Sequence, residues 1–226
     1  MSYNHNPRGV FIIFVYKFAY KVVKMLQSIA MNFIKYREFL DIFMQDIDAI
    51  FEHQKDYIFC KEGCSHCCEY GEYPFTQLEF EYLMQGYETL DETTKLQIQE
   101  NIKNIKQDDV GYYICPFLIN KRCSVYTHRA LVCRTFGLLN KENDGRVNGP
   151  FCGKMGLNYS NVFDKNTKEL LPDIIKKNNY KNMPKVFDMN ITNIKKLDLV
   201  QELNIEFGEQ KALLDWLREY EFGTRK

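Results

Sequence analysis

The sequence has no excess of charge of either sign and no apolar run long enough to cross a membrane. Its 226 residues hold 30 Lys and Arg against 30 Asp and Glu, a net charge of zero. A nucleic-acid-binding surface is expected to carry a clustered basic footprint, so this balance argues against such a partner. The apolar stretch at 10–16 is followed by Lys17, Lys21 and Lys24, and falls far short of the ~20 apolar residues of a spanning helix. We therefore predict neither a nucleic-acid partner nor a transmembrane segment.

Histidine is also scarce, and none of the four histidines carries a catalytic signature. Residues 160–226 contain no cysteine and no histidine, and the chain has no internal repeat, low-complexity tract or long linker. We accordingly predict no catalytic residue and leave open whether the protein is an enzyme. The four histidines are His5, His53, His66 and His128.

Residues 1–30 allow three interpretations. As a secretory signal, this stretch has only one basic residue, Arg8, ahead of a seven-residue apolar core, and its cleavage match at Ser28-Ile29-Ala30 is loose. We favour a dispensable extension ahead of an internal Met25 or Met31. A third, less favoured interpretation is a helix that contacts a membrane surface peripherally through residues 8–27. We therefore expect reduced cysteines and a cytoplasmic protein.

The chain does contain eight cysteines, and four of them lie within nine residues of sequence. Cys60 and Cys64 are spaced i, i+4, and Cys64 and Cys67 are spaced i, i+3, so one helical turn or tight loop can direct three sulfurs to one point. Cys68 leaves the backbone about 100° away from Cys67 on a helix and is predicted to serve another ligand set. The predicted metal ligands are Cys60, Cys64, Cys67, Cys68, Cys115, Cys123, Cys133 and Cys152.

Two other chemistries use parts of this motif. The Cys-x3-Cys-x2-Cys spacing matches radical S-adenosylmethionine enzymes, but the chain after Cys67 shows no alternating strand and helix pattern. The CxxC at 64–67 could be a redox dithiol, but its acidic surroundings would raise a thiolate pKa. We interpret His66 as a hydrogen-bond donor to sulfur rather than a ligand.

The remaining pattern predicts a mainly α domain with a small β-hairpin (α+β), stapled by metal. A heptad stripe from Phe33 to Tyr57 predicts a long helix that faces the core, with a coiled-coil dimer as the alternative. Thr76 and Glu79 form a capping-box pattern, Asp91 is expected to cap the next helix, and residues 212–220 read as a final helix. We divide the chain into an extension at 1–30, a cysteine-cluster domain at 31–159 and a helical extension at 160–226.

The second cysteine region predicts more local structure. Residues 115–126 read as a β-hairpin that brings Cys115 and Cys123 together near its base. Thr127 is predicted to cap a short helix that carries Cys133 and is closed by Gly137. A turn is expected at 143–145, and the glycines of 149–153 are expected to let backbone approach a sulfur-ligated centre. Cations that could offset thiolate charge are Lys121, Arg129 and Arg134.

The cysteine pattern resembles a known family. CxxxCxxCC at 60–68, CPFL at 115–118, CSVYTHRALVCRTFG at 123–137 and Cys152 are similar to the YkgJ-type cysteine-cluster family, a zinc- or iron-chelating domain with eight cysteines. One departure is Ala130, where the family usually has proline. The resemblance implies metal binding and no particular substrate. Members are often labelled iron–sulfur oxidoreductases, and the region is also similar to part of the flagellin lysine methylase proteins.

The metal itself has two alternatives. Two four-cysteine sites are the arithmetic default, and one site with additional structural or substrate-facing thiols is the other possibility. Structural zinc favours pairs of CxxC motifs, whereas this chain has one CxxC and a Cys115-Pro116 dipeptide of the kind found at a ferredoxin cluster ligand. We therefore favour an iron–sulfur cluster, 4Fe-4S first, with a redox or electron-transfer role and an unknown partner. The alternative is a structural zinc adaptor that binds partners through aromatic surfaces at Phe75, Tyr82 and Phe117.

Overall fold

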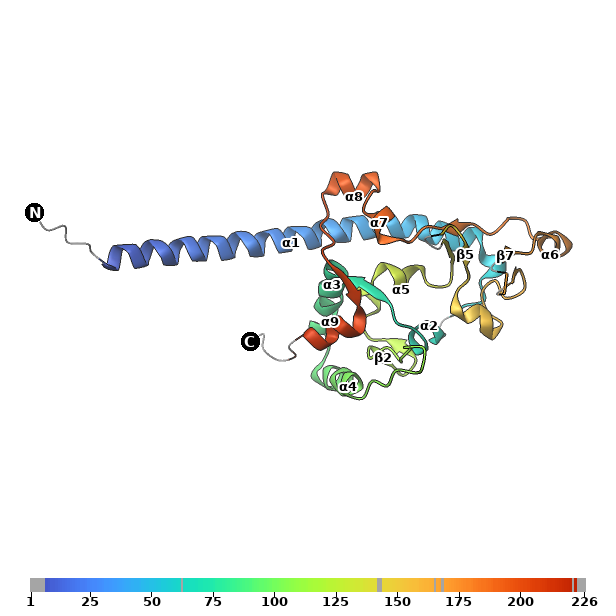
Figure 1. Cartoon of the computed structure of the whole chain (residues 1–226), viewed down its shortest axis with the longest axis horizontal. Coiled ribbons are helices and arrows are strands. Elements are labelled where there is room, and N and C mark those ends of the chain that lie inside the picture. The colour runs from blue at the N-terminus through green and yellow to red at the C-terminus, as the bar shows by residue number, and fades with distance from the viewer. Residues whose placement is uncertain are drawn as a thin grey trace, which may run out of the picture.

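The computed structural model describes residues 7–61, 63–141, 144–164, 166–167, 169–220 and 222, with side chains described from Ala19 onward. Its architecture is mainly helical with small sheets, as the sequence predicted (Figure 1). The α-helices are α1 (Pro7–His53), α2 (His66–Glu69), α3 (Gln77–Glu88), α4 (Glu92–Lys103), α5 (Leu131–Thr135), α6 (Pro172–Lys177), α7 (Ile191–Ile194), α8 (Asp198–Leu203) and α9 (Leu213–Glu219). Short 3-10 turns cover Lys55–Tyr57, Tyr126–His128 and Phe151–Met155.

The strands are short and pair segments that are distant in sequence. The predicted hairpin is present, with β2 (Leu118–Ile119) antiparallel to β3 (Arg122–Cys123). In addition, β1 (Pro74–Thr76) pairs with β9 (Gln210–Ala212), β4 (Leu139–Lys141) lies between β5 (Val147–Asn148) and β8 (Val186–Phe187), and β6 (Phe163–Asp164) pairs with β7 (Glu169–Leu170).

Helix α1 is longer than predicted, and its two halves have different surroundings. The heptad stripe is confirmed from Phe33 onward, because Phe33, Tyr36, Leu40 and Ile47 are buried against the chain's own elements. Over this stretch α1 is therefore the core-facing helix that the sequence favoured, and not the coiled-coil alternative. The N-terminal half extends away from the body as a single helix (Figure 1).

Helix α3 begins at the predicted capping box, which also connects it to α5. Thr76 Oγ1 accepts from Glu79 N, and Glu79 Oε2 accepts from Thr76 N at 2.9 Å. The other carboxylate oxygen, Glu79 Oε1, accepts from Leu131 N at 2.9 Å. Since α5 begins at Leu131, one buried carboxylate caps two helices. Asp91 caps α4 as predicted, by accepting from Thr94 N.

The C-terminal segment completes the same core. Ile194, Val200 and Phe207 pack with the buried face of α1, and Trp216 Nε1 donates to Phe75 O at 2.9 Å. The predicted final helix is present as α9. Since segments from both predicted units share one core, the boundary at 159/160 marks the end of the cysteine pattern, and the three-part division of the chain stays a prediction.

One predicted surface is absent among the residues that the structure describes. Phe75, Tyr82 and Phe117 were expected to offer aromatic contacts to a partner, but all three are buried in the core. Phe75 and Phe117 pack with residues of α3 and α9, and Tyr82 packs edge-on against Tyr36 of α1. Folding uses these rings for internal packing, so they cannot bind a partner without unfolding.

We predict that Glu79→Gln destabilises the protein by about 1–3 kcal/mol, because an amide NH2 at either oxygen position faces Thr76 N or Leu131 N and leaves that donor without an acceptor. Urea unfolding followed by circular dichroism measures the change. The matched control is Glu88→Gln on the same helix, whose carboxylate is half exposed. It should change stability by no more than about 0.5 kcal/mol. Equal effects of the two substitutions would contradict the double-cap interpretation.

Candidate metal centre

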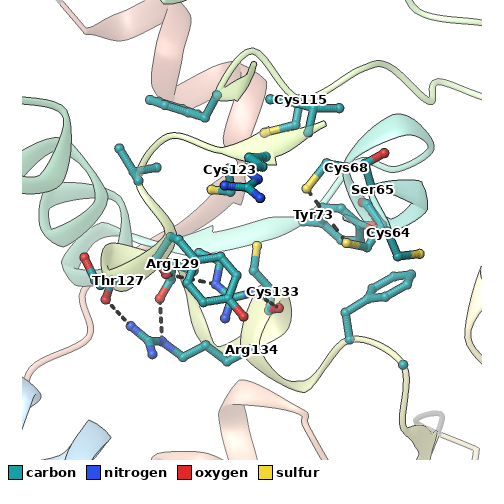
Figure 2. A pocket seen from close by; sticks show the side chains of 18 of the residues that line it. Cys64, Ser65, Cys68, Tyr73, Cys115, Cys123, Thr127, Arg129, Cys133 and Arg134 are labelled. Atoms are coloured by element: carbon teal, nitrogen blue, oxygen red, sulfur yellow. Dashed lines mark hydrogen bonds between the residues drawn. The ribbon is translucent and has the colours of Figure 1, made fainter. Parts of the chain in front are cut away.

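All eight predicted cysteines line one cavity of about 1200 Å³. Figure 2 shows how the segments meet there: Cys64 and Cys68 lie on the side of α2, Cys115 precedes the hairpin, Cys123 lies on its second strand, and Cys133 lies on α5. The opposite wall includes residues 37–51 of α1. The structure thus brings together side chains that span 93 positions of sequence, and all eight are free thiols.

The first cysteine segment is held by side-chain hydrogen bonds. Ser65 Oγ donates to Glu69 Oε1 at 2.6 Å, and His66 Nδ1 lies 3.1 Å from Glu69 Oε2, so the turn that begins α2 is tied at both ends. The His66 ring therefore contacts a carboxylate, whereas a hydrogen bond to sulfur was predicted. Tyr73 Oη donates to Cys67 O at 2.7 Å and fixes the backbone between two ligand candidates.

The second segment attaches directly to the first. Cys115 N donates to Cys68 O at 2.7 Å, which places the start of the hairpin region beside α2. In the hairpin, Cys123 pairs with Leu118 and not with Cys115. Asn120 and Lys121 both have positive φ, 50° and 61°, the conformation of a tight two-residue hairpin turn. Cys115 lies three residues before β2, so its closeness to Cys123 comes from the turn at Pro116 and Phe117 and not from the ladder.

The prediction that Thr127 caps a helix is wrong. Residues 126–128 form a 3-10 turn, and α5 starts at Leu131 with Ala130 at the N-cap. Two arginines hold this connection by donating to backbone carbonyls: Arg129 Nε to Tyr126 O, Arg134 Nε to Arg129 O, and Arg134 Nη2 to Thr127 O. Ala130 has φ −65°, the value that proline fixes, so the alanine keeps the conformation that the family's usual proline imposes.

Asn158 is a residue that the sequence gave no reason to single out. Its side chain is buried, and Oδ1 accepts from Phe59 N at 2.9 Å and from Cys60 N at 3.0 Å. Its Nδ2 donates to Gly137 O at 3.0 Å, directly after α5. The Asn158 backbone N–H also bonds to the Cys152 thiol. One amide therefore positions both Cys60 and the end of α5, and its backbone contacts a third element of the site.

The prediction for the glycines of 149–153 is also wrong. A Cβ at Gly149 would lie 2.8 Å from the Phe163 ring, and a Cβ at Gly153 would lie 2.9 Å from Asn158 O. These glycines allow close packing against neighbouring protein, whereas the sequence suggested an approach to the metal. The predicted turn at 143–145 is present at Asp144 and Gly145, and Asn143 lies outside the described residues.

The thiols divide into two neighbouring sets by their electrostatic interactions. Burial and the charges of Cys64, Cys67 and Cys152 raise the pKa of Cys60 to about 11, and burial raises the pKa of Cys152 with contributions from Cys64 and Cys67. In the second set, burial and Cys123 raise the pKa of Cys115 to about 12. Burial raises the pKa of Cys133 and that of Cys123. The thiols therefore resist ionisation where no cation is present.

Cys67 and Cys68 stand between these sets. Their sulfurs are 3.8 Å apart, and a hydrogen bond from the Cys68 thiol, helped by Arg129, lowers the pKa of Cys67 to about 7. The same bond and burial raise the pKa of Cys68, with further contributions from Cys115 and Cys123. Cys68 thus interacts with the hairpin cysteines, whereas Cys67 interacts with thiols of both sets, Cys60 and Cys152 in the first and Cys115, Cys123 and Cys133 in the second.

The thiols that line the cavity are suitable metal ligands, but in their present positions they do not enclose an ion. No three His, Cys, Asp or Glu side chains among the described residues converge closely enough to enclose an ion, so binding would require rotation of the thiols. The Tyr113 hydroxyl, however, is buried with no acceptor for its proton in the described part of the chain, although the Leu214 backbone N–H lies beside it, and it lines the same cavity near Cys115. A buried hydroxyl whose proton has no acceptor costs free energy, and a thiolate or inorganic sulfide there would accept that proton.

The other residues with predicted roles are accounted for as follows. His53 is exposed at the end of α1, and His128 packs against the Tyr82 ring, so neither lines the cavity. His5 lies outside the described residues. Lys121, Arg129 and Arg134 all line the cavity, which agrees with their predicted place beside thiolate charge.

Eight thiols around one cavity define a cysteine-rich metal-binding domain. Comparison with known families agrees, because residues 59–153 match the family model CxxCxxCC, described as "putative zinc- or iron-chelating domain". This match supports the resemblance to the cysteine-cluster family that the motifs at 60–68, 115–137 and 152 predicted. No curated protein matches the chain, and no solved structure matches it.

We predict that Asn158→Ala lowers metal affinity by about 10–100-fold, because Cys60 N and Gly137 O lose the amide that positions them. Isothermal titration of the apoprotein with Zn²⁺ measures this change. Asn161→Ala is the matched control, because Asn161 is exposed and its side chain bonds only to the Tyr180 hydroxyl among the bonds described. Metal affinity that is unchanged in Asn158→Ala would show that Asn158 does not position the site.

Proposed function

We propose that the cavity holds two four-thiolate centres. The first uses Cys60, Cys64, Cys67 and Cys152, and the second uses Cys68, Cys115, Cys123 and Cys133. The observation that supports this proposal is that Cys68 interacts with Cys115 and Cys123, whereas Cys60 and Cys152 interact with Cys64. Cys67 interacts with thiols of both groups, and we assign it to the first because that gives each centre four thiols. Four thiolates satisfy either zinc or an iron–sulfur cluster.

Charge supports metal loading of both sets. Removing the protons from buried thiols is opposed by desolvation and by their mutual repulsion, and a bound cation offsets both terms. Arg129 lowers the pKa of Cys67 and offsets part of the rise at Cys133, so the protein already supplies one positive group that acts on both sets. A bound metal would add the positive charge that full ionisation of the thiols requires.

Within metal binding, we favour iron–sulfur centres with a redox or electron-transfer role. The Cys115-Pro116 dipeptide and the run of three cysteines at 60–67 support clusters over zinc. Tyr113 adds support, because an inorganic sulfide or a cluster thiolate would accept from its hydroxyl. When bound, such clusters supply one-electron transfer, and the exposed position of Cys60 gives the first set contact with solvent.

A structural zinc protein is the second candidate. Two closed sets of four thiolates are what structural zinc sites require, and this observation favours zinc. The aromatic surface that an adaptor would use at Phe75, Tyr82 and Phe117 is buried, which removes its predicted partner contact. A cytoplasmic location, where thiols stay reduced, remains part of the proposal.

The first experiment is the metal and acid-labile sulfide content of protein purified without oxygen, together with its visible spectrum. Iron and sulfide with a broad absorption that bleaches on reduction are expected. Stoichiometric zinc in a colourless protein would exclude the redox role and support the structural one. Intact disulfides with no metal would overturn both.

A second experiment tests the division into two sets. We expect Cys60→Ser and Cys133→Ser each to remove about half of the bound metal, because each damages a different centre. The pair Cys60→Ser with Cys64→Ser should lose no more metal than Cys60→Ser alone, whereas Cys60→Ser with Cys133→Ser should lose nearly all of it. Equal and complete loss in both single variants would show one site in place of two.

A further inference from the structure

The N-terminal half of α1 forms an arm that extends beyond the body. We define the arm as residues 7–32, which precede Phe33, the first side chain of the helix described as buried. Its last residue, Asn32, joins it to the body through two hydrogen bonds with the Glu206 backbone. At 1.5 Å per residue the arm is about 40 Å long. Figure 1 shows it extending beyond the body as a lone helix. Such a length of exposed helix requires some partner, because helical stability in proteins comes mainly from packing of an apolar face.

The exposed side chains of the arm are mostly apolar. Tyr20 is 64% exposed, Leu26 56%, Val23 51% and Ile29 40%. With 100° of rotation per residue, these four and Met25 cover about 220° of the helix circumference. A coiled-coil partner covers only a narrow a/d seam, whereas a lipid interface covers a broad face. The breadth of the arc therefore favours lipid over a second helix.

The positive charge of the arm favours an anionic lipid surface. Residues 7–32 contain four Lys and Arg and no Asp or Glu. Lys21 and Lys24 are exposed, they lie on the arc that the apolar residues leave free, and Lys24 Nζ is 5.8 Å from the centre of the Tyr20 ring. Two such arms side by side would repel each other, whereas an anionic membrane surface attracts each lysine. Lysine stems can also lie along the apolar face while their charges remain in water.

The arm does not meet the requirements for a spanning helix. No helix within the described residues is long and apolar enough to cross a membrane. An amphipathic helix with lysines on one arc and aromatic and aliphatic residues on the rest lies in the interfacial plane instead.

We propose that residues 7–32 form an interfacial membrane-binding arm that selects surfaces rich in anionic phospholipid. The arm places its apolar arc at the boundary between headgroups and acyl chains, and its lysines contact lipid phosphates. The body stays in water and is joined to the arm by the continuous helix α1.

The test is co-sedimentation of the full-length protein with vesicles of phosphatidylcholine alone and with vesicles containing about 30% phosphatidylglycerol. We expect binding to the anionic vesicles, at least tenfold weaker binding to the neutral ones, and loss of binding as salt rises. Leu26→Glu should weaken binding on the order of tenfold or more, since one buried leucine contributes about that factor. Lys21→Glu combined with Lys24→Glu should weaken binding to anionic vesicles selectively.

Matched controls separate the arm from general surface effects. Leu96→Glu changes a leucine on α4 that is 64% exposed, and Lys176→Glu with Lys177→Glu reverses two exposed lysines on α6. Both should bind vesicles as the wild type does. Two results would overturn the proposal: a wild type that ignores anionic vesicles or binds neutral ones equally well, and an arm that instead forms a dimer in light scattering, with Leu26→Glu restoring the monomer.

Discussion

The rest of the site depends on eight thiols that line one cavity and oppose one another's ionisation. Burial and mutual repulsion raise the pKa of most of these thiols, so the protein opposes the ionised form that a metal requires. A cation reverses that opposition, and its binding energy then holds the segments together. The cysteine segments have little regular structure of their own, with only short turns, two-residue strands and the short helices α2 and α5. Their arrangement therefore depends on what the thiols bind.

Two buried polar side chains, Glu79 and Asn158, prepare the cavity before any metal binds. Glu79 fixes the start of α5 against the start of α3, and Asn158 fixes the end of α5 against Cys60. Cys133 lies on the short helix between these two anchors. In each case a side chain satisfies backbone donors that burial would otherwise leave without partners. The position of α5 is thus set from both ends by groups that are not ligand candidates.

Local features were predictable from the sequence because their causes are local. The Thr76 capping box, the Asp91 cap, the hairpin turn at Asn120 and the buried stripe of α1 each depend on residues within a few positions of one another. The eight-cysteine pattern indicated the candidate site and its family in the same way.

Features that depend on distant contacts could not be read from the sequence. Asn158 acts across 98 positions on Cys60, and no neighbouring residue indicates this. Thr127 had a favourable cap pattern, but arginine contacts to the surrounding carbonyls hold a 3-10 turn instead. Gly149 and Gly153 looked like space for a cofactor because sequence cannot show that Phe163 and Asn158 already fill it. The buried Phe75 illustrates the same limit, since an aromatic residue fits a core as well as a surface.

The peptide bond between Cys67 and Cys68 joins residues of the two proposed thiol sets. In the proposed arrangement these two adjacent residues serve different centres, so a single peptide unit joins both thiol sets. One residue inserted there would rotate Cys68 by about 100° relative to Cys67 within α2 and misdirect one of the two sulfurs. A single change in chain length at this bond would therefore disturb both proposed centres together.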